Sequence, residues 1–298
     1  MDRFHLMNVF VAVAEEQGFA ATARRLHLSP PAVTRAVAAL EEQLGVKLLN
    51  RTTRFVRVTE AGRRYIEDAK RILDDLEAAD EAAAGINATP RGHLAITAPV
   101  LFGRMFVMPG IVDYLNAYPD TEVSAMFLDR IVNLLEEGVD VGIRIGELPD
   151  SSLRALRVGS VRAILCASPQ YLQRYGLPGT PKDLLAHSII ASSAGNNAIN
   201  WRFENAALRI QPRLTVTTND AAIEAARRGF GITRLLSYQV AGQLGEGGLK
   251  IVLEKFEPPP LPIYIVHREG RFASARIRAF VDLMAKRLRA DKALNQPA

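Results

Sequence analysis

The chain has 298 residues, enough for two or three domains of ordinary size, and its 48% hydrophobic content is typical of a globular protein. A single cysteine, Cys166, excludes an internal disulfide and is interpreted as a small buried hydrophobic residue. The formal net charge is +5, yet residues 24–57 alone carry seven Lys or Arg against two Glu, which also gives +5. Because the rest of the chain is near neutral, this local basic patch indicates a surface that contacts phosphates rather than non-specific binding by the whole protein.

Three helices and a basic hairpin are predicted for the start of the chain. Residues 2–17 form a helix whose apolar face is expected to pack under two further helices, at 20–26 and 29–44. Ser29 is a good N-cap for the third helix, and Pro30 stands at its first position, where a missing N–H costs nothing. The apolar face of this third helix is formed by Val33, Val37, Leu40 and Leu44.

The opposite face of the third helix and the hairpin carry the candidate contacts to DNA. Thr34 and Arg35 lie near the start of the helix, where a recognition helix reads base edges. Arg51 and Arg54, in the hairpin, are expected to meet phosphates or the minor groove. A charged surface that only faces solvent is the alternative. The predicted DNA-binding residues are Ser29, Pro30, Pro31, Thr34, Arg35, Arg51, Thr52 and Arg54.

A long helix is predicted from Thr59 to about residue 86. Its apolar positions alternate in steps of four and three, which is the heptad spacing of a coiled coil. This seam favours pairing with the helix of a second copy, and the alternative is that it packs on its own chain. The seam consists of Tyr65, Ala69, Ile72, Leu76, Ala79, Ala83 and Ile86.

Strands and helices alternate beyond a polar linker at residues 87–92, which predicts a mostly parallel α/β structure. The expected strands are 93–97, 122–127, 139–145, 188–191, 210–217, one beginning at 231, 250–253 and 263–267. The expected helices are 102–117 with a bend near Pro109, 131–137, 169–175, 181–186, 219–228 and 273–288. The predicted domains are residues 1–58, 59–88 and 89–298, the last split into lobe I (about 89–162 and 267–298) and lobe II (about 163–266).

The sequence resembles the LysR-type transcriptional regulators. Two segments carry the resemblance, ATARRLHLSPPAVTRAVAALEEQLGVKLLNR at residues 21–51 and VRVTEAG at 56–62. The resemblance implies an α+β multi-domain fold: an N-terminal winged helix-turn-helix, a long dimerising linker helix and a two-lobed α/β sensor domain like periplasmic binding proteins. Pro30 departs from the family, which usually has a polar residue after the capping Ser, and Arg234 stands where the family is usually apolar.

The candidate effector site follows from a rule of α/β folds: ligands bind beyond the carboxyl ends of strands and near helix N-termini. The predicted effector-binding residues are Pro99, Val100, Leu101, Phe102, Arg144, Ile145, Thr218, Asn219, Thr233 and Arg234. Arg144 and Arg234 would clamp an anion, which favours a small carboxylate whose apolar body rests on residues 100–102. Alternatively, these arginines pair with Asp140, Glu147 or Asp220 and the ligand is neutral. Trp201 is interpreted as a core residue rather than a ligand platform.

Enzyme motifs for metal, nucleotide or nucleophilic chemistry do not occur in the sequence, and its five histidines are scattered. We therefore expect no catalytic residues, no metal site and no cofactor. Two other classes of protein fit the sequence less well. A solute-binding protein of a transporter would carry a signal peptide, which this sequence does not show, and would leave residues 1–60 unexplained. An α/β enzyme would need a nucleophile motif, which the sequence also does not show. The sequence predicts a cytoplasmic regulator without membrane contact. It is expected to bind double-stranded promoter DNA as a homodimer or, as the family implies, a homotetramer, with DNA binding or activation modulated by a small molecule.

Overall fold

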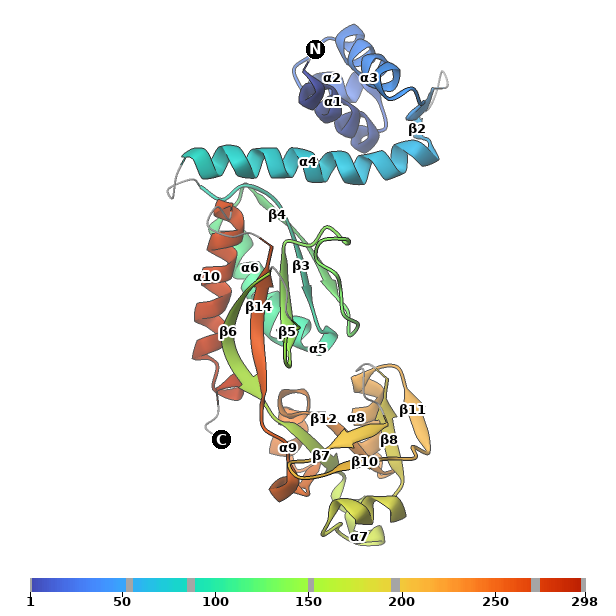
Figure 1. Cartoon of the computed structure of the whole chain (residues 1–298), viewed down its shortest axis with the longest axis vertical. Helices are drawn as coiled ribbons and strands as arrows, with labels where there is room; N and C mark the ends of the chain where they lie inside the picture. Colours follow the sequence, from blue (N-terminus) through green and yellow to red (C-terminus); the bar gives the residue numbers. More distant parts are fainter. Residues whose placement is uncertain are drawn as a thin grey trace. The chain divides into compact units, whose positions relative to one another are not determined.

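The computed structural model describes residues 2–51, 56–84, 89–149, 153–193, 199–268 and 274–295. The chain divides into two compact units, residues 1–88 and residues 89–298 (Figure 1). Among the described helices, none combines the length and the apolar composition needed to cross a lipid bilayer. Each unit has its own core and is described separately below.

The N-terminal unit begins with the three predicted helices, α1 (Arg3–Glu16), α2 (Phe19–Arg25) and α3 (Pro30–Leu44). The Ser29 hydroxyl accepts a hydrogen bond from the Ala32 N–H at 3.3 Å, so the predicted N-cap is confirmed. The helix ends at Gly45, whose φ of +66° is the left-handed conformation that glycine adopts without strain. The core of the unit is formed by the apolar faces of the three helices, including Leu6, Phe10, Val33, Val37 and Leu40.

The wing is a two-stranded antiparallel sheet of β1 (Leu49–Arg51) and β2 (Val56–Val58). Glu41 of α3 anchors it, because its buried carboxylate accepts the N–H groups of Leu48 and Leu49 at 2.9 and 3.1 Å and the Lys47 ammonium at 2.8 Å. Burial raises the pKa of Glu41, but the hydrogen bonds from Lys47 and the two backbone N–H groups outweigh it and leave the pKa lowered.

The long helix α4 (Glu60–Ala84) packs its first half on its own chain. Ala69 is fully buried, and the Tyr65 ring lies 5.8 Å from the ring of Phe10 in α1. Ile72, the next seam residue, is 40% exposed. The alternative of packing on the same chain therefore holds for the first part of the seam and not for Ile72. The side chains of Ala79 and Ala83, and Ile86 as a whole, lie outside the described residues.

Lobe I of the second unit is a five-stranded mixed sheet in the order β4-β3-β5-β14-β6. Its strands are β3 (Gly92–Ala98), β4 (Thr121–Phe127), β5 (Val141–Ile145), β6 (Arg154–Val161) and β14 (Leu261–His267). Its helical segments are α5 (Val100–Phe102), the π-helical η1 (Gly103–Val107), α6 (Met108–Ala117), α10 (Ala275–Ala290) and η5 (Lys292–Leu294). Helices α6 and α10 lie together along the sheet, with the rings of Tyr114 and Phe280 5.4 Å apart (Figure 1).

Lobe II is a second five-stranded sheet in the order β11-β8-β12-β7-β13. Its strands are β7 (Ala163–Ala167), β8 (Ile189–Ser192), β11 (Leu214–Val216), β12 (Ile232–Leu236) and β13 (Lys250–Val252), with a separate hairpin of β9 (Asn200–Arg202) and β10 (Ala207–Arg209). Its helical segments are α7 (Pro169–Tyr175), η2 (Pro181–Ala186), α8 (Asn219–Arg227), η3 (Ser237–Val240), α9 (Ala241–Gly245) and η4 (Glu254–Phe256).

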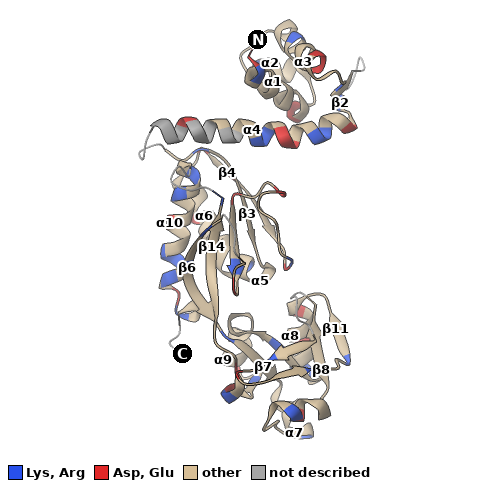
Figure 2. Ribbon diagram, viewed as in Figure 1, with Lys and Arg blue, Asp and Glu red and all other residues tan. Residues whose placement is uncertain are grey.

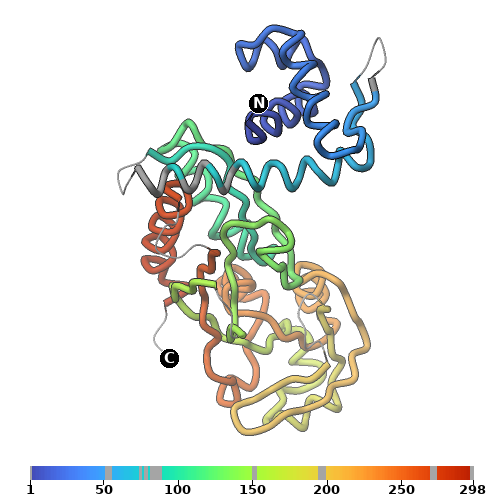
Figure 3. Tube along the Cα trace, turned by 45° about the horizontal axis from the view of Figure 1, so that its top comes forward, coloured from blue at the N-terminus to red at the C-terminus, as the bar shows by residue number. Residues whose placement is uncertain are grey.

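The chain passes between the lobes twice, from β6 to β7 and from η4 to β14 (Figure 3). The two passages are adjacent, since Leu261 pairs with Val161. Arg162 on the first passage forms ion pairs with Glu254 and Glu257 on the second, at 2.9 and 3.4 Å. All of β14 belongs to the lobe I sheet, so the return comes before residue 261 rather than at the expected 267.

Several expected elements are corrected by the structure. Residues 131–137 form no helix, because the Asn133 and Glu137 side chains bind nearby backbone N–H groups in place of helical carbonyls. The expected strand 210–217 is reduced to β11, while β6, the β9–β10 hairpin and the helical turns of η3 and α9 were not expected. The irregularity in helix 102–117 is the π-helical turn η1, which lies just before Pro109. Proline has no N–H to donate to the carbonyl of Met105, four residues earlier, and its ring would clash with that carbonyl in a regular α-helix.

Replacing Glu41 with Ala should destabilise the N-terminal unit by about 2 kcal/mol, because the N–H groups of Leu48 and Leu49 lose a buried acceptor. Urea unfolding followed by far-UV circular dichroism measures this change. Since folding lowers the pKa of Glu41, its stabilisation is present above the ordinary value of 4.5 and is lost as pH falls through the lowered value. The exposed neighbour Glu42→Ala is the control, and equal effects of the two variants would contradict the anchoring role.

Candidate DNA-binding surface and effector cleft

The expected recognition surface is exposed at the start of α3. Ser29, Pro30, Pro31, Thr34 and Arg35 are all solvent-exposed, whereas Val33, Ala36 and Val37 of the same helix are buried. The Thr34 hydroxyl donates to the Pro30 carbonyl at 3.0 Å and keeps its acceptor lone pairs free for a partner. Within the described ranges, no ion pair occupies the Arg35 guanidinium.

The wing adds positive charge beside this helix within the same unit. Arg57 of β2 is exposed, and the antiparallel pairing sets it opposite Asn50. Figure 2 shows an Arg on β2, and charges of both signs on α3 and along α4. The backbone of Arg51 ends β1, but its side chain, together with Thr52 and Arg54, lies outside the described residues.

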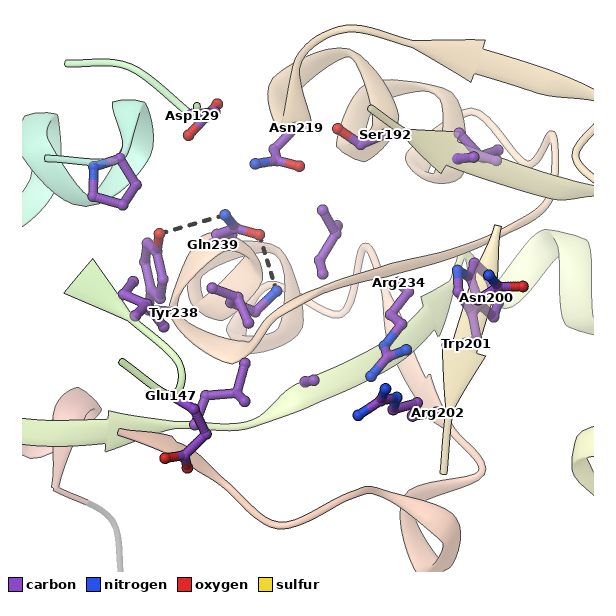
Figure 4. Close-up of a pocket in the computed structure, with 18 of the residues that line it drawn as sticks. Asp129, Glu147, Ser192, Asn200, Trp201, Arg202, Asn219, Arg234, Tyr238 and Gln239 are labelled. Carbon is purple, nitrogen blue, oxygen red and sulfur yellow. Dashed lines mark hydrogen bonds between the residues drawn. The ribbon is translucent and has the colours of Figure 1, made fainter. Parts of the chain in front are cut away.

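A cavity of about 620 Å³ lies between the two lobes of the second unit. This volume suits a small organic molecule. Its wall is apolar with a few charged and polar groups (Figure 4). Lobe I contributes Pro99, Asp129, Ile131, Ile145, Glu147 and Leu261, and lobe II contributes Ala163, Ile190, Ala191, Ser192, Asn200, Trp201, Arg202, Asn219, Arg234, Leu235, Leu236, Tyr238 and Gln239.

The lobe II wall carries two arginines. Strand alternation buries Thr233 and Leu235 and leaves Arg234 half-buried on the cavity side of β12. Arg202 follows Trp201 in β9, and Figure 4 shows the two guanidinium groups close to each other. Burial lowers the pKa of Arg234, and among the described residues no carboxylate or carbonyl is bonded to its guanidinium. This end of the cavity therefore carries positive charge.

The lobe I wall is acidic. The Asp129 carboxylate, in the loop after β4, accepts the Val100 N–H at 3.0 Å. Burial raises the pKa of Asp129; the bond from Val100 lowers it, and nearby Asp220 raises it further. Glu147, at the end of β5, is exposed at the cavity edge. The cavity thus has carboxylates on one lobe and guanidinium groups on the other.

The cavity wall at Tyr238 and Gln239 is held in place by the Gln239 side-chain amide and by three packed aromatic rings. The Gln239 side-chain oxygen accepts the Leu236 N–H at 2.9 Å, while its nitrogen donates to the Tyr238 hydroxyl at 3.4 Å (Figure 4). The Tyr238 ring packs edge-on against Phe102 and Phe106 of lobe I at 5.3 and 5.6 Å. These contacts fix the shape of the cavity where the lobes meet.

The structure brings four of the ten expected effector residues to this cavity: Pro99, Ile145, Asn219 and Arg234. The others are not on its wall. Leu101, Phe102 and Thr233 are buried, and the Thr218 hydroxyl caps α8 by accepting the Ala221 N–H at 3.3 Å. The Val100 side chain is 38% exposed but is not part of the wall.

Arg144 has a different position from the one expected. Its guanidinium donates to the Val132 carbonyl and so holds the turn that follows β4. Burial lowers the pKa of Arg144, and the Glu137 carboxylate opposes that shift. Neither Asp140 nor Glu147, the expected ion-pair partners, is bonded to it in the described structure; Asp140 instead accepts the Ala95 N–H at 2.8 Å.

The sequence pattern did not predict Asp129, Arg202, Tyr238 or Gln239 as wall residues. Asp129 lies in an ordinary loop, and Arg202 lies in a hairpin of three-residue strands that has no clear periodicity. Trp201 is 2% exposed and belongs to the core of lobe II, as expected, but it also lines the cavity.

Comparison with known proteins agrees with this architecture over nearly the whole chain. Residues 4–63 match the bacterial regulatory helix-turn-helix protein, lysR family, and residues 87–289 match the LysR substrate binding domain. The chain therefore belongs to the LysR family of DNA-binding transcriptional regulators, which are not enzymes, and its second unit is the family's effector-binding domain.

Particular relatives extend along the full length. The transcriptional activator AaeR of Escherichia coli is 33% identical over 90% of this chain and 88% of its own. The structure of CrgA from Neisseria meningitidis is 30% identical with a TM-score of 0.61, covering 95% of this chain and 98% of that one. The full-length Vibrio cholerae virulence activator AphB is 27% identical with a TM-score of 0.61, covering 96% and 99%.

Arg144→Ala should lower the stability of the effector-binding domain by about 1–2 kcal/mol, because the Val132 carbonyl loses a charged donor. A fall of a few degrees in melting temperature is expected for a domain of this size. Arg154→Ala, on an exposed strand position, is the control. An unchanged melting temperature combined with loss of ligand stabilisation would show instead that Arg144 contacts the ligand.

Proposed function

We propose that this regulator binds promoter DNA as a dimer and responds to an anionic small molecule held by Arg202 and Arg234. The observation that carries the effector assignment is the half-buried Arg234 guanidinium, which faces a cavity between two lobes and has no bonded carboxylate among the described residues. Because its partner is promoter DNA, we place its action in the cytoplasm. Ligand binding between the lobes would change their separation and so modulate DNA binding or activation.

The N-terminal residues of α3 are proposed to read base edges in the major groove. Support comes from the exposure of Thr34 and Arg35 at the start of a capped helix, the geometry by which a recognition helix docks. Pro30 and Pro31 are exposed beside them and offer apolar contact to a thymine methyl group. Arg51, Thr52 and Arg54 remain proposed wing contacts to the phosphate backbone.

Arg35→Ala should weaken specific binding by about 1–3 kcal/mol and relax the preference at one base position. Fluorescence anisotropy with the chain's own promoter fragment and single-base variants measures both effects. Arg64→Ala, whose exposed guanidinium pairs with Glu60 on α4, is the control for simple loss of charge. Equal effects of the two variants, without any change in base preference, would reject base readout by Arg35.

Dimerisation is proposed to use the part of α4 that its own chain leaves uncovered. Ile72 is 40% exposed and Leu76 half-buried, while Tyr65 and Ala69 already pack on α1. An apolar stripe at heptad spacing gains stability when a second helix covers it. A tetramer built from two such dimers is the further assembly that the resemblance to the LysR family implies.

Ile72→Asp combined with Leu76→Asp should convert the dimer into a monomer, because two unpaired carboxylates would enter the seam. Light scattering gives the mass, and loss of affinity for promoter DNA should follow. Circular dichroism should show that the effector-binding domain stays folded. The control is Glu67→Asp together with Asp68→Glu at exposed positions of α4. An unchanged mass of the double aspartate variant would refute the proposed interface.

Arg234→Gln should abolish the thermal stabilisation that small carboxylates give to the full-length protein. The probes are straight-chain and aromatic monocarboxylates, each compared with its neutral amide. Arg174→Gln, at an exposed position of α7 away from the cavity, is the control. If the amides stabilise the protein as well as the carboxylates do, the anionic effector is rejected and a neutral ligand takes its place.

A further inference from the structure

The cavity between the lobes contains two opposite charges that do not neutralise each other. Arg234 lies on the lobe II wall and Asp129 on the lobe I wall. In the described structure no hydrogen bond or ion pair joins them, and the Asp129 carboxylate accepts the Val100 N–H. Partly buried charges without partners are costly, so each favours a ligand group of opposite sign.

Two charged groups that could compete with a ligand are paired with other residues of the protein. Arg104 of η1 in lobe I lies 3.8 Å from Asp220. Glu257 shares a small adjoining cavity with Arg234, but its carboxylate lies 3.4 Å from the Arg162 guanidinium. The acidic wall and the basic wall are therefore left to a ligand.

Uncharged side chains, some polar and some apolar, make up most of the cavity wall around these two charged groups. Figure 4 shows Asp129 beside Asn219 and Gln239 on one side, and Arg234 beside Arg202 and Trp201 on the other. Ile190, Leu235 and Leu236 add apolar side chains to the cavity wall. Such a wall suits a hydrocarbon or aromatic body.

We propose that the effector is dipolar: a carboxylate bound by Arg234 and Arg202, and a protonated amine bound by Asp129, with an apolar body joining them. This inference rests on the proposed function of the cavity as the effector site. Asn219 offers a side-chain oxygen to a remaining N–H group of the amine. An α-amino acid carries both charges on one carbon, so it cannot serve both walls as an ω-amino acid does.

Isothermal titration calorimetry of the full-length protein with three matched series tests the proposal. The ω-amino acids are γ-aminobutyrate, δ-aminovalerate and ε-aminocaproate. For each, the unsubstituted carboxylate and the α-amino acid of the same carbon number serve as comparisons. At least one ω-amino acid should bind about tenfold more tightly than both of its matched compounds, because it gains a charge-assisted hydrogen bond at Asp129.

Asp129→Asn should reduce the affinity for that ω-amino acid about tenfold, to the level of the matched carboxylate, and leave the carboxylate's own affinity unchanged or higher. Asp282→Asn, at an exposed position of α10, is the control. The wild-type comparison of the three series stands on its own if the Asp129 variant does not fold.

Two outcomes separate this inference from the proposed function. If carboxylates bind as tightly as ω-amino acids at every length, the dipolar effector is refuted and the anionic effector stands. If no ω-amino acid binds while the monocarboxylates still stabilise the protein through Arg234, the same conclusion follows. If neither class binds, both assignments fall.

Discussion

The contact of Tyr238 with Phe102 and Phe106 is the interaction on which the effector-binding domain depends. Phe102 and Phe106 come from the helical segment after β3 in lobe I, and Tyr238 comes from the turn after β12 in lobe II. Their rings lie 4.8–5.6 Å apart within one apolar cluster that includes residues of both sheets. Burial of such large rings is a strong non-directional attraction, so it holds the lobes together while the cavity between them remains open to a ligand.

This contact also explains why Leu101 and Phe102, which were expected to contact the effector, are not on the cavity wall. Leu101 and Phe102 follow a strand end, as binding residues in α/β folds do, but their size and apolar character make them better packing residues. They are packed in the core of the domain instead, where Phe102 contacts Tyr238. The wall is formed instead by residues at the edges of the same segment, Pro99 and Asp129, and by Ile145 on the neighbouring strand.

The N-terminal unit was predictable in detail because its signals are local. The Ser29 cap, the Gly45 end and the apolar spacing of α3 act within a few residues of one another. The sensor domain was less predictable where its strands depend on distant partners. Strand β6 pairs with β14, about a hundred residues later, and a sequence with Gly159 in its middle gives no local strand signal. The expected helix at 131–137 failed for the opposite reason, since the Asn133 and Glu137 side chains bind the backbone locally.

The residues of the cavity wall can be divided in the same way, into those that local sequence patterns predict and those whose positions depend on the tertiary fold. The rule of strand ends located Pro99, Ile145, Asn219 and Arg234, but it could not distinguish Arg234 from Arg144, because both are arginines on central strands near a predicted cleft. The difference lies in what covers each side chain: the turn after β4 offers the Val132 carbonyl to Arg144, whereas Arg234 meets open space. Arg202 and Asp129 come from a hairpin and a loop whose positions depend on the tertiary fold.

Cys166, in the middle of β7, gives the molecule a practical property. The thiol is fully buried, and burial raises its pKa to about 12, so it is uncharged and out of reach of thiol reagents in the folded state at neutral pH. It is also the one cysteine of the whole sequence. A cysteine introduced at an exposed position on either lobe would therefore be modified selectively, and a pair of spectroscopic labels could follow lobe closure with the native thiol left in place.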